Sequence, residues 1–343
     1  MSPSSVPESS DWAGLSRRTL VGSAAGVAAS LAVGPATPAA AATGPRGPGS
    51  VSGVPRLPAG FTRTFKSVLV DTGAVRLHAV VGGSGPALLL IHGWPENWYA
   101  WRLVMPELAR HFRVVAVDQR GMGISGKPAD GYDTGTLAGD LVALMDALGH
   151  QRFSVVGHDT GMVIAYALAA DHRDRVDRLA VAETTLPGVV QGPLLFVDAP
   201  TNDVIWHIPF NRIHTTNELL VRDREDIFFG FEFAHRTVKP MPDYVLDYYI
   251  GGFAASRDAL RGSFEFYRAI DATTAQNKER AKQMLTLPVL AIAGGMSSKD
   301  TVFKTMSAAA SDVQSLIVPD CGHFVAEEKP DALLAGLLPF LAP

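Results

Sequence analysis

Short apolar segments alternate along the chain with longer segments of helical length, starting near residue 65. The apolar segments are rich in β-branched and aliphatic residues, as in "VRLHAVV", "ALLLIHG", "RVVAVD" and "FSVVGH". Longer segments, such as Thr134 to Leu148 and Gly161 to Ala170, lie between several of them. This repetition of strand and helix predicts an α/β fold with a mostly parallel sheet and helices on both faces.

The alternation stops between Glu183 and about Leu285. That stretch contains the aromatic-rich runs "DIFFGFEFAH", "DYVLDYY" and "SFEFYRAI", which are typical of packed helices. Helices inserted after one strand would form a lid over the carboxyl ends of the strands, where α/β sheets hold their sites. We therefore expect a core formed by residues 61–183 and 286–343, and a helical lid formed by residues 184–285.

The N-terminal segment has the pattern of an export signal. Arg17-Arg18 precedes an apolar run from Thr19 to Val33, and an Ala40-x-Ala42 pattern follows. The run is shorter than the roughly 20 apolar residues of a membrane-spanning helix. We expect residues 1–42 to be a bacterial twin-arginine signal, residues 43–60 to be a flexible Gly/Pro-rich lead-in, and the mature protein to be secreted without stable membrane insertion.

Composition and motif spacing exclude several classes of function. The chain has 343 residues, and 47% of them are hydrophobic, as in a soluble globular protein. Its 30 basic residues are scattered among 34 acidic ones and do not form the positive cluster that binds nucleic acid. "GMGISG" at 121–126 matches a dinucleotide fingerprint, but Lys127-Pro128 interrupts the helix that the motif requires. No cluster has metal-ligand spacing, and the single Cys321 is too near His323 in sequence for a nucleophile–base pair. We expect neither cofactor nor metal.

The segment "VVGHDTG" at 155–161 has the form of a nucleophile elbow with aspartate at its centre. Gly157 and Gly161 permit a sharp turn from strand to helix, which would present Asp159 alone above the sheet. The backbone N–H of Thr160, with that of Trp94 in "HGWP", would then face a developing oxyanion. The alternative is that Asp159 merely caps the helix, since aspartate is a favourable N-cap residue.

A histidine and an acidic residue would complete a catalytic triad with Asp159. His323 lies in "PDCGHFVAEE", after the last predicted strand, and the order nucleophile, acid, histidine is that of the α/β-hydrolase fold. Two acids could orient it: Glu183 ends the strand before the lid, whereas Asp300 lies several residues beyond a later strand. The spacing favours Glu183 and leaves Asp300 open.

The motifs "HGWPENWYAWR", "DQRGMGISGKP", "GHDTG", "VIWHIPF", "SFEFYRAI" and "CGHF" resemble those of the epoxide hydrolases of the α/β-hydrolase superfamily, most of all the exported bacterial Cif-like type. The resemblance implies an α/β-hydrolase fold, a small-molecule epoxide substrate, and a homodimer. It also implies roles for five residues: Asp159 as nucleophile, Glu183 as acid, His323 as base, and His207 with Tyr267 as ring-opening donors. Without the resemblance, His207 and Tyr267 are as well explained by packing in the lid.

An aspartate nucleophile suits an epoxide because the reacting carbon is sp³. A carboxylate can displace at that carbon to give an alkyl ester, while a lid histidine or phenol protonates the departing alkoxide. His323, oriented by Glu183, would then activate water to attack the ester, with the N–H groups of Trp94 and Thr160 holding the oxyanion.

Two alternatives remain at this stage. Dehalogenases use the same aspartate, but haloalkane dehalogenases typically have Trp where this chain has Thr160. Fluoroacetate dehalogenases have arginines near the nucleophile, where this chain has apolar residues 162–164, and Trp after the lid histidine, where it has Ile208. A non-catalytic binding protein with the same fold is the other alternative, because a fold does not determine a function.

Overall fold

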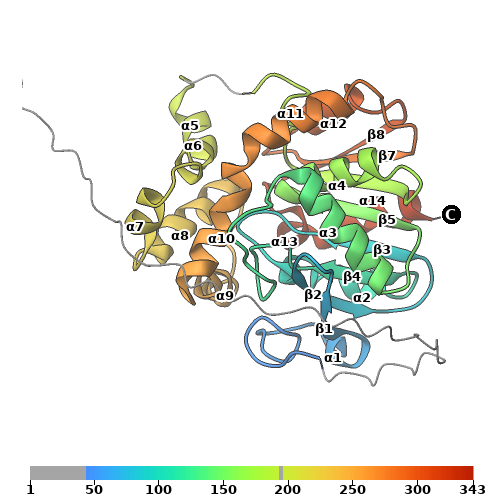
Figure 1. The fold of residues 1–343 in the computed structure, drawn as a ribbon, viewed down its shortest axis with the longest axis horizontal. Coiled ribbons are helices and arrows are strands. Elements are labelled where there is room, and N and C mark those ends of the chain that lie inside the picture. Colours follow the sequence, from blue (N-terminus) through green and yellow to red (C-terminus); the bar gives the residue numbers. More distant parts are fainter. Residues whose placement is uncertain (1–43, 193–195, 343) are drawn as a thin grey trace, which may run out of the picture. The chain divides into compact units, whose positions relative to one another are not determined.

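The computed structural model describes residues 44–192 and 196–342, so the predicted export signal at 1–42 lies outside the described residues. Within the described chain, eight strands form one sheet in the order β1-β2-β4-β3-β5-β6-β7-β8 (Figure 1). The β1–β2 and β2–β4 pairs are antiparallel and the other neighbours are parallel, so the predicted fold class is confirmed. The strands are β1 (Lys66–Asp71), β2 (Arg76–Gly82), β3 (Ala87–Ile91), β4 (Arg113–Val117), β5 (Phe153–His158), β6 (Val176–Ala182), β7 (Val289–Gly294) and β8 (Val313–Val318).

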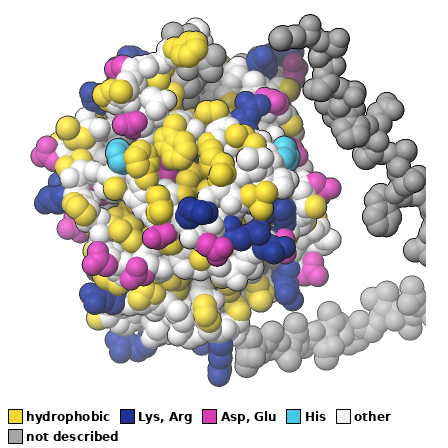
Figure 2. All heavy atoms as spheres, turned by 90° about the vertical axis from the view of Figure 1, so that its left-hand side faces the viewer, with side chains coloured by type: hydrophobic (Ala, Val, Ile, Leu, Met, Phe, Trp, Pro, Cys, Tyr) yellow, Lys and Arg dark blue, Asp and Glu magenta, His cyan; other side chains and the backbone are white. Residues whose placement is uncertain are grey.

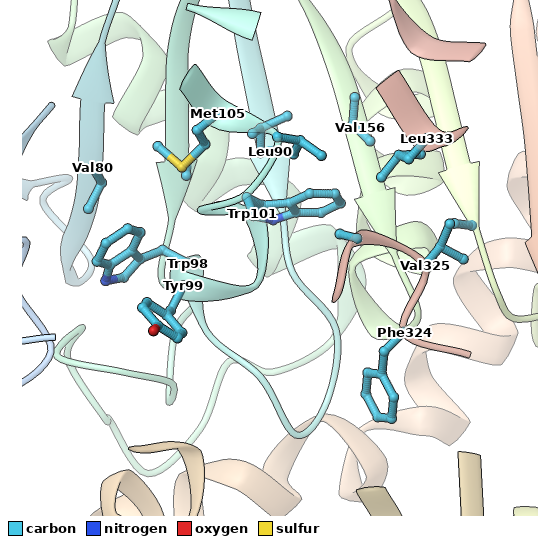
Figure 3. Packing of buried hydrophobic residues seen from close by; sticks show 14 of the residues in the cluster. Val80, Leu90, Trp98, Tyr99, Trp101, Met105, Val156, Phe324, Val325 and Leu333 are labelled. Atoms are coloured by element: carbon cyan, nitrogen blue, oxygen red, sulfur yellow. The ribbon is translucent and has the colours of Figure 1, made fainter. Parts of the chain in front are cut away.

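Side chains of the central strands alternate between two apolar layers, one on each face of the sheet. Along β3, Leu88 and Leu90 enter one layer, and Leu89 and Ile91 enter the other. Burying each such side chain contributes roughly 1.5–3 kcal/mol. Figure 3 shows the first layer, where strand residues meet the aromatic side chains of the 3-10 helix η1. The core helices are α1 (Phe61–Thr64), η1 (Trp98–Trp101), α2 (Met105–Leu108), α3 (Thr134–Ala147), α4 (Thr160–Asp171), α12 (Thr301–Ser307), α13 (Val325–Glu328) and α14 (Pro330–Leu341).

A group of helices follows β6 and precedes β7, inside the residues for which the sequence predicts a lid (Figure 1). Aromatic contacts join them, such as the stacked rings of Phe229 and Phe253, whose centroids are 4.3 Å apart. The lid helices are α5 (Ala199–Ile205), α6 (His207–Asn211), α7 (Thr216–Val221), α8 (Glu225–Arg236), α9 (Asp243–Ala254), α10 (Arg257–Arg268) and α11 (Ile270–Arg280).

The lead-in at residues 44–60 differs from the expectation that it is flexible. The indole N–H of Trp98 donates to the carbonyl of Gly49 at 2.7 Å, and the hydroxyl of Tyr99 donates to the carbonyl of Pro55 at 2.6 Å. The backbone N–H of Val51 donates to Ser67 at 2.9 Å. The segment is therefore packed on the core, because its carbonyls satisfy polar groups of η1 that would otherwise be buried without partners.

The outer face of the lid carries several exposed apolar side chains among charged ones (Figure 2). Ile227 on α8 is 68% exposed, and Leu219 and Leu220 on α7 are 60% and 57% exposed. None of the helices in the described part of the chain has the length and apolar character needed to span a bilayer.

Candidate active site

Asp159 lies at the turn between β5 and α4 and has a positive φ of 53°. Such a conformation is strained for a residue with a side chain, and strained residues cluster at functional sites. A Cβ on Gly161 would collide with the carbonyl oxygens of Ile91 and His92, and one on Gly157 would collide with the carbonyl of Gly161. The two glycines thus allow the turn that places Asp159 just beyond the carboxyl end of β5.

Two backbone N–H groups hold one oxygen of the Asp159 carboxylate. The N–H of Trp94 donates to Oδ1 at 3.0 Å, and the N–H of Thr160 donates to the same atom at 2.6 Å. Thr160 is the first residue of α4, so Asp159 also caps that helix. The capping and nucleophile interpretations of the sequence are therefore compatible. Both N–H groups that the sequence predicts as oxyanion donors reach this carboxylate.

The imidazole of His323 lies between two carboxylates. Its Nε2 is 3.2 Å from Oδ2 of Asp159, and its Nδ1 is 3.3 Å from Oε2 of Glu183. The backbone N–H of His323 donates to the carbonyl of Arg236 at 2.8 Å, and its carbonyl accepts from Nε2 of His158 at 2.8 Å. These two hydrogen bonds fix the backbone of the loop after β8 at His323.

Glu183, and not Asp300, is the acid beside His323. Glu183 directly follows β6 with a φ of 70°, and its carboxylate accepts hydrogen bonds from the backbone N–H of Gly294, from Ser297 at 2.7 Å and from Ser298 at 3.0 Å. Asp300 lies at the surface and pairs with Lys304. The structure thus resolves the alternative that the sequence left open, because only Glu183 ends a strand at the sheet edge that faces the histidine.

The charges of this group are strongly coupled. Burial disfavours the ionised form of Asp159, yet the contact with His323 holds the pKa of that carboxyl well below its usual range. Burial also disfavours a charged His323, but the contacts with Asp159 and Glu183 raise its pKa to about 9. At neutral pH, Asp159 is a carboxylate beside an imidazolium. Neutralising Asp159 would remove a main cause of the raised pKa, so the imidazole would then release its proton more easily.

His207 and Tyr267 lie together on the lid side of the site. His207 begins α6 and stacks on Trp94 with ring centroids 5.0 Å apart, and Tyr267 on α10 meets both rings edge-on at 5.5 Å. Burial raises the pKa of Tyr267 well above its usual value, with Asp159 adding to the effect. Burial and the charge of Arg236 lower the pKa of His207 well below its usual value. Both side chains are therefore neutral at neutral pH and can donate a hydrogen bond.

The lid contains a buried charged pair that the sequence did not predict. Glu232 and Arg236, one turn apart on α8, are 1% and 7% exposed, and Arg236 Nη2 lies 3.3 Å from Glu232 Oε2. Burial raises the pKa of Glu232 to about 7, although the nearby Arg236 opposes that shift. Both positions fall on the buried face of α8, which includes Phe229 and Phe233. The sequence signal for this pair is the presence of charged residues on the apolar face of an amphipathic helix, where charged residues are rare.

A cavity of about 510 Å³ joins the core residues to the lid residues. It is in the size range of small-molecule sites. A larger cavity of about 720 Å³ beside α9 is lined by none of the predicted site residues. The lining of the smaller cavity includes the charged and polar residues Asp159, Thr160, Glu183, His207, Arg236, Tyr267 and His323, and the apolar residues Val163, Val204, Ile205, Ile208, Phe266 and Ile270.

The other sequence features lie apart from this chemistry. Residues 121–126, the "GMGISG" segment, form a loop after β4 and do not open a helix. The thiol of Cys321 is buried, and burial raises its pKa to about 12, so it is not a thiolate at neutral pH. In the described ranges 44–192 and 196–342, no group of three or more His, Cys, Asp or Glu residues could hold a metal ion.

Comparisons with known proteins agree with this architecture. A family model described as alpha/beta hydrolase fold matches residues 86–330. The chain is 33% identical over 278 residues to a soluble epoxide hydrolase from Corynebacterium sp. (strain C12), covering 78% of this chain and 94% of that protein. It is 46% identical to a fluoroacetate dehalogenase from Burkholderia sp over 124 residues, or 35% of this chain and 41% of that protein. The crystal structure of Cfl2 from Burkholderia cenocepacia matches with a TM-score of 0.79 and 34% identity, covering 84% of this chain and 99% of that one.

Proposed function

The chain belongs to the α/β-hydrolase fold family, and from that premise we propose that it is an epoxide hydrolase, which converts an apolar epoxide to a vicinal diol through an ester on Asp159. One observation carries the proposal: two N–H groups hold Oδ1 of Asp159, while Oδ2 lies 3.2 Å from Nε2 of His323. Similarity to proteins named epoxide hydrolases supports it. The apolar part of the cavity supports an apolar substrate.

In the first half of the proposed reaction, a carboxylate oxygen of Asp159 attacks an epoxide carbon. A C–O bond to the enzyme forms, and the C–O bond of the ring breaks with its electrons on oxygen. Tyr267 and His207 hydrogen-bond to that oxygen as its charge develops, which is typically worth roughly 10² to 10⁴-fold in rate. The alkoxide gains one proton. His323 can supply it by way of the cavity, since its pKa falls once Asp159 has become a neutral ester.

In the second half, neutral His323 removes a proton from water, and the resulting hydroxide attacks the ester carbonyl of Asp159. Oδ1 becomes an oxyanion that accepts from the N–H groups of Trp94 and Thr160, which already point at that atom. Collapse of this intermediate breaks the ester C–O bond, and the departing alkoxide takes the proton of the newly added hydroxyl, which releases the diol. It also restores the carboxylate and the imidazolium, so the protons balance over one cycle.

Trapping of the ester is the direct test. His323→Gln should still open the ring, with water in the cavity supplying the proton to the alkoxide, but should hydrolyse the ester slowly, so mass spectrometry should find the protein heavier by one whole substrate on Asp159. Asp159→Ala should form no adduct. In a single turnover of the native enzyme in ¹⁸O-water, label should enter the Asp159 carboxylate before it enters the diol. Label in the first-turnover diol together with no adduct would reject the nucleophile role.

A dehalogenase is the second candidate, because one relative that matches a third of this chain is named a fluoroacetate dehalogenase. The absence of arginine directly after Asp159 is a weaker argument against it than the sequence alone implied, since Arg236 lines the cavity from the lid. A panel of epoxides, haloalkanes and fluoroacetate separates the possibilities. Diol formation without halide release supports our proposal, the reverse supports a dehalogenase, and no turnover leaves a non-catalytic binding protein.

We propose in addition that the protein is exported through the twin-arginine pathway. The support is Arg17-Arg18 ahead of a short apolar run, in residues that the structure does not describe. Replacing both arginines by lysine should retain the protein inside the cell, whereas the parent should be secreted with a mature N-terminus near Thr43. Undiminished secretion of the variant would reject this route.

The homodimer that the family resemblance implies is also a proposal. The exposed apolar side chains of α7 and α8, among them Leu219, Leu220 and Ile227, support an interface on the lid. Sedimentation equilibrium should give twice the monomer mass, and Ile227→Lys should reduce it. A native chain that sediments as a monomer would reject the dimer.

A further inference from the structure

The lid helix α10 meets the core at a close contact between two glycines. A Cβ on Gly262 of α10 would lie 2.5 Å from the carbonyl oxygen of Gly121, and a Cβ on Gly121 would lie 2.9 Å from the carbonyl oxygen of Gly262. Both separations are shorter than van der Waals contact, so neither position can hold a side chain unless the backbone moves. Gly121 is the first residue of the "GMGISG" segment, so this contact gives that segment a part in docking the lid.

The core side of this contact is fixed by hydrogen bonds and packing. The backbone N–H of Gly121 donates to the carbonyl of Gly126 at 2.9 Å, and the N–H of Gly126 donates to the carbonyl of Arg76 in β2 at 2.8 Å. Behind the loop lies the buried ring of Tyr132, only 2.7 Å from where a Cβ on Gly121 would be. The hydroxyl of Tyr132 in turn donates to the carbonyl of Pro128 at 2.9 Å. Because the loop is held in this way, a side chain added to the helix would displace α10.

The contact adjoins the active site. A void of about 10 Å³ beside Gly262 is lined by Trp94 and Thr160, whose N–H groups are the predicted oxyanion donors, and by Phe266. Such a void is at most the space of one water molecule, so it cannot absorb an added methyl group. Phe266, one turn after Gly262, also lines the cavity of about 510 Å³, as does Tyr267. The distance between α10 and the sheet is therefore set close to the point where Tyr267 enters the cavity.

We propose that the contact between Gly121 and Gly262 is a positioning contact, which sets how far the Tyr267 hydroxyl lies from Asp159. The proposal rests on the proposed function, in which Tyr267 donates to the epoxide oxygen. Gly262 and Tyr267 lie on one continuous helix, roughly 7.5 Å apart along its axis, so a shift at the first reaches the second. Neither glycine is among the residues that line the cavity, so both act through Tyr267.

The position of Tyr267 can be read without any substrate. In protein labelled with 3-fluorotyrosine, the ¹⁹F resonance of Tyr267 is assigned by its loss in Tyr267→Phe. The rings of Trp94 and His207, with centroids 5.5 Å from that of Tyr267, make the resonance sensitive to movement. Gly262→Ala should shift it, because the added methyl group collides with the core loop. Gly251→Ala is the matched control, since Gly251 lies on α9 and a Cβ there would meet nothing.

Both variants should fold, because alanine is more favourable than glycine inside a helix. The control should leave the Tyr267 resonance in its native position. Because the spectra need no turnover, they remain informative even if no epoxide is a substrate and the proposed function fails.

The matched kinetic experiment is a double-mutant cycle on ring opening, measured in a single turnover with an aromatic epoxide. Gly262→Ala should slow ring opening about 10-fold, because Tyr267 is displaced while His207 remains as a donor, and hydrolysis of the ester should keep its native rate. When Tyr267 is already replaced by phenylalanine, the same change should slow ring opening by less than about 2-fold, since no hydroxyl is left to displace. A general packing role would give equal losses in both backgrounds. Gly251→Ala should match the native enzyme.

A neighbouring contact covers the case in which Gly262→Ala does not fold. The guanidinium of Arg261 donates to the carbonyls of residues 127 and 128 at 2.6 and 3.1 Å, so it ties the same turn of α10 to the core. Arg261→Gln should also shift the Tyr267 resonance, whereas Arg257→Gln, at an exposed position of the same helix, should not.

Three results would each overturn the proposal. One is a Tyr267 resonance that stays in its native position in Gly262→Ala, or in Arg261→Gln if only that variant folds. Another is a native rate of ring opening in Gly262→Ala. The third is an equal loss of rate from Gly262→Ala with and without the Tyr267 hydroxyl.

Discussion

The two halves of the site are held in different ways. On the core side, the residues at the strand ends receive their positions from the backbone: Asp159 and Glu183 each follow a strand directly, and backbone N–H groups donate to both carboxylates. On the lid side, His207, Tyr267 and Arg236 come from three helices, and the side chain of His207 contacts the side chains of the other two.

The difference also appears in how well the buried carboxylates are satisfied. Each carboxylate on the core side accepts at least two hydrogen bonds. In the lid, both oxygens of Glu232, the Nε of Arg236 and the indole N–H of Trp206 have no hydrogen-bond partner among the described residues. Unsatisfied buried groups cost stability. The core half therefore has one arrangement, whereas the lid half depends on a balance of charges that substitution can shift.

The largest effect should come from breaking the core half at Glu183. Glu183→Gln keeps the shape but removes the charge that orients His323, and the comparable change in a serine protease triad lowers kcat by about 10⁴-fold. We expect turnover to fall by roughly 10³-fold, with hydrolysis of the ester slowed and ring opening retained. Pre-steady-state kinetics with one epoxide separates the two steps.

Asp300→Asn is the matched control for that change. Asp300 is the other acid that the sequence left open, and its partner is Lys304 at the surface. Turnover should match that of the native enzyme. A loss in Asp300→Asn similar to that in Glu183→Gln would contradict the assignment of Glu183.

A smaller effect should come from removing one lid donor. Tyr267→Phe deletes a single hydroxyl, and ring opening should slow by roughly 10 to 100-fold because His207 still donates. Tyr166→Phe is the control, because Tyr166 is also a buried tyrosine but lies on α4, and its hydroxyl has no hydrogen-bond partner in the described chain. Equal ring-opening rates for the two variants would mean that Tyr267 only packs in the lid.

The smallest effect concerns the stability of the core half at alkaline pH. The pKa of His323 is raised to about 9 in the folded protein, so its stabilisation is complete below its unfolded pKa of 6.5 and is lost as the pH rises through 9. We expect the contribution of His323 to the free energy of unfolding in urea to drop by about 2 to 3 kcal/mol between pH 6.5 and pH 9.5. In Asp159→Asn the free energy of unfolding should drop much less over the same pH range, because a neutral neighbour no longer favours the imidazolium. Glu232 titrates in both proteins, so its contribution does not distinguish them. Parallel pH profiles would contradict the coupling.

The positions of the core residues can be predicted from the sequence for a physical reason. The residues that hold Asp159 are neighbours in sequence, because an elbow needs glycine at fixed spacing and the first N–H of the helix directly after it. The sheet then brings Asp159, Glu183 and His323 to one edge through its strand order. Strands follow from local apolar patterns, and the carboxyl ends of parallel strands lie at one edge of the sheet, so the meeting of these residues could be predicted without the strand order.

The lid half was predicted only in part. His207 and Tyr267 were named through the family resemblance, whereas Glu232 and Arg236 were not recognised at all. Contacts between helices depend on how each helix is rotated and packed, which no local motif encodes. The run "FFGFEFAHR" predicts aromatic packing, and its two charged residues differ from the usual case, in which isolated charged residues are solvated.

The pair of N–H groups at Oδ1 of Asp159 affects the two half-reactions in opposite ways under the proposed mechanism. In the resting enzyme they stabilise a carboxylate that must give up charge to attack the epoxide, so for ring opening they stabilise the ground state. In ester hydrolysis the same carbonyl oxygen starts neutral and becomes an oxyanion, so they stabilise the transition state. Only the latter kind of stabilisation accelerates a step. The two hydrogen bonds to this oxygen therefore favour the attack of water on the ester. Ring opening is then the step that depends most on the hydrogen-bond donors of the lid.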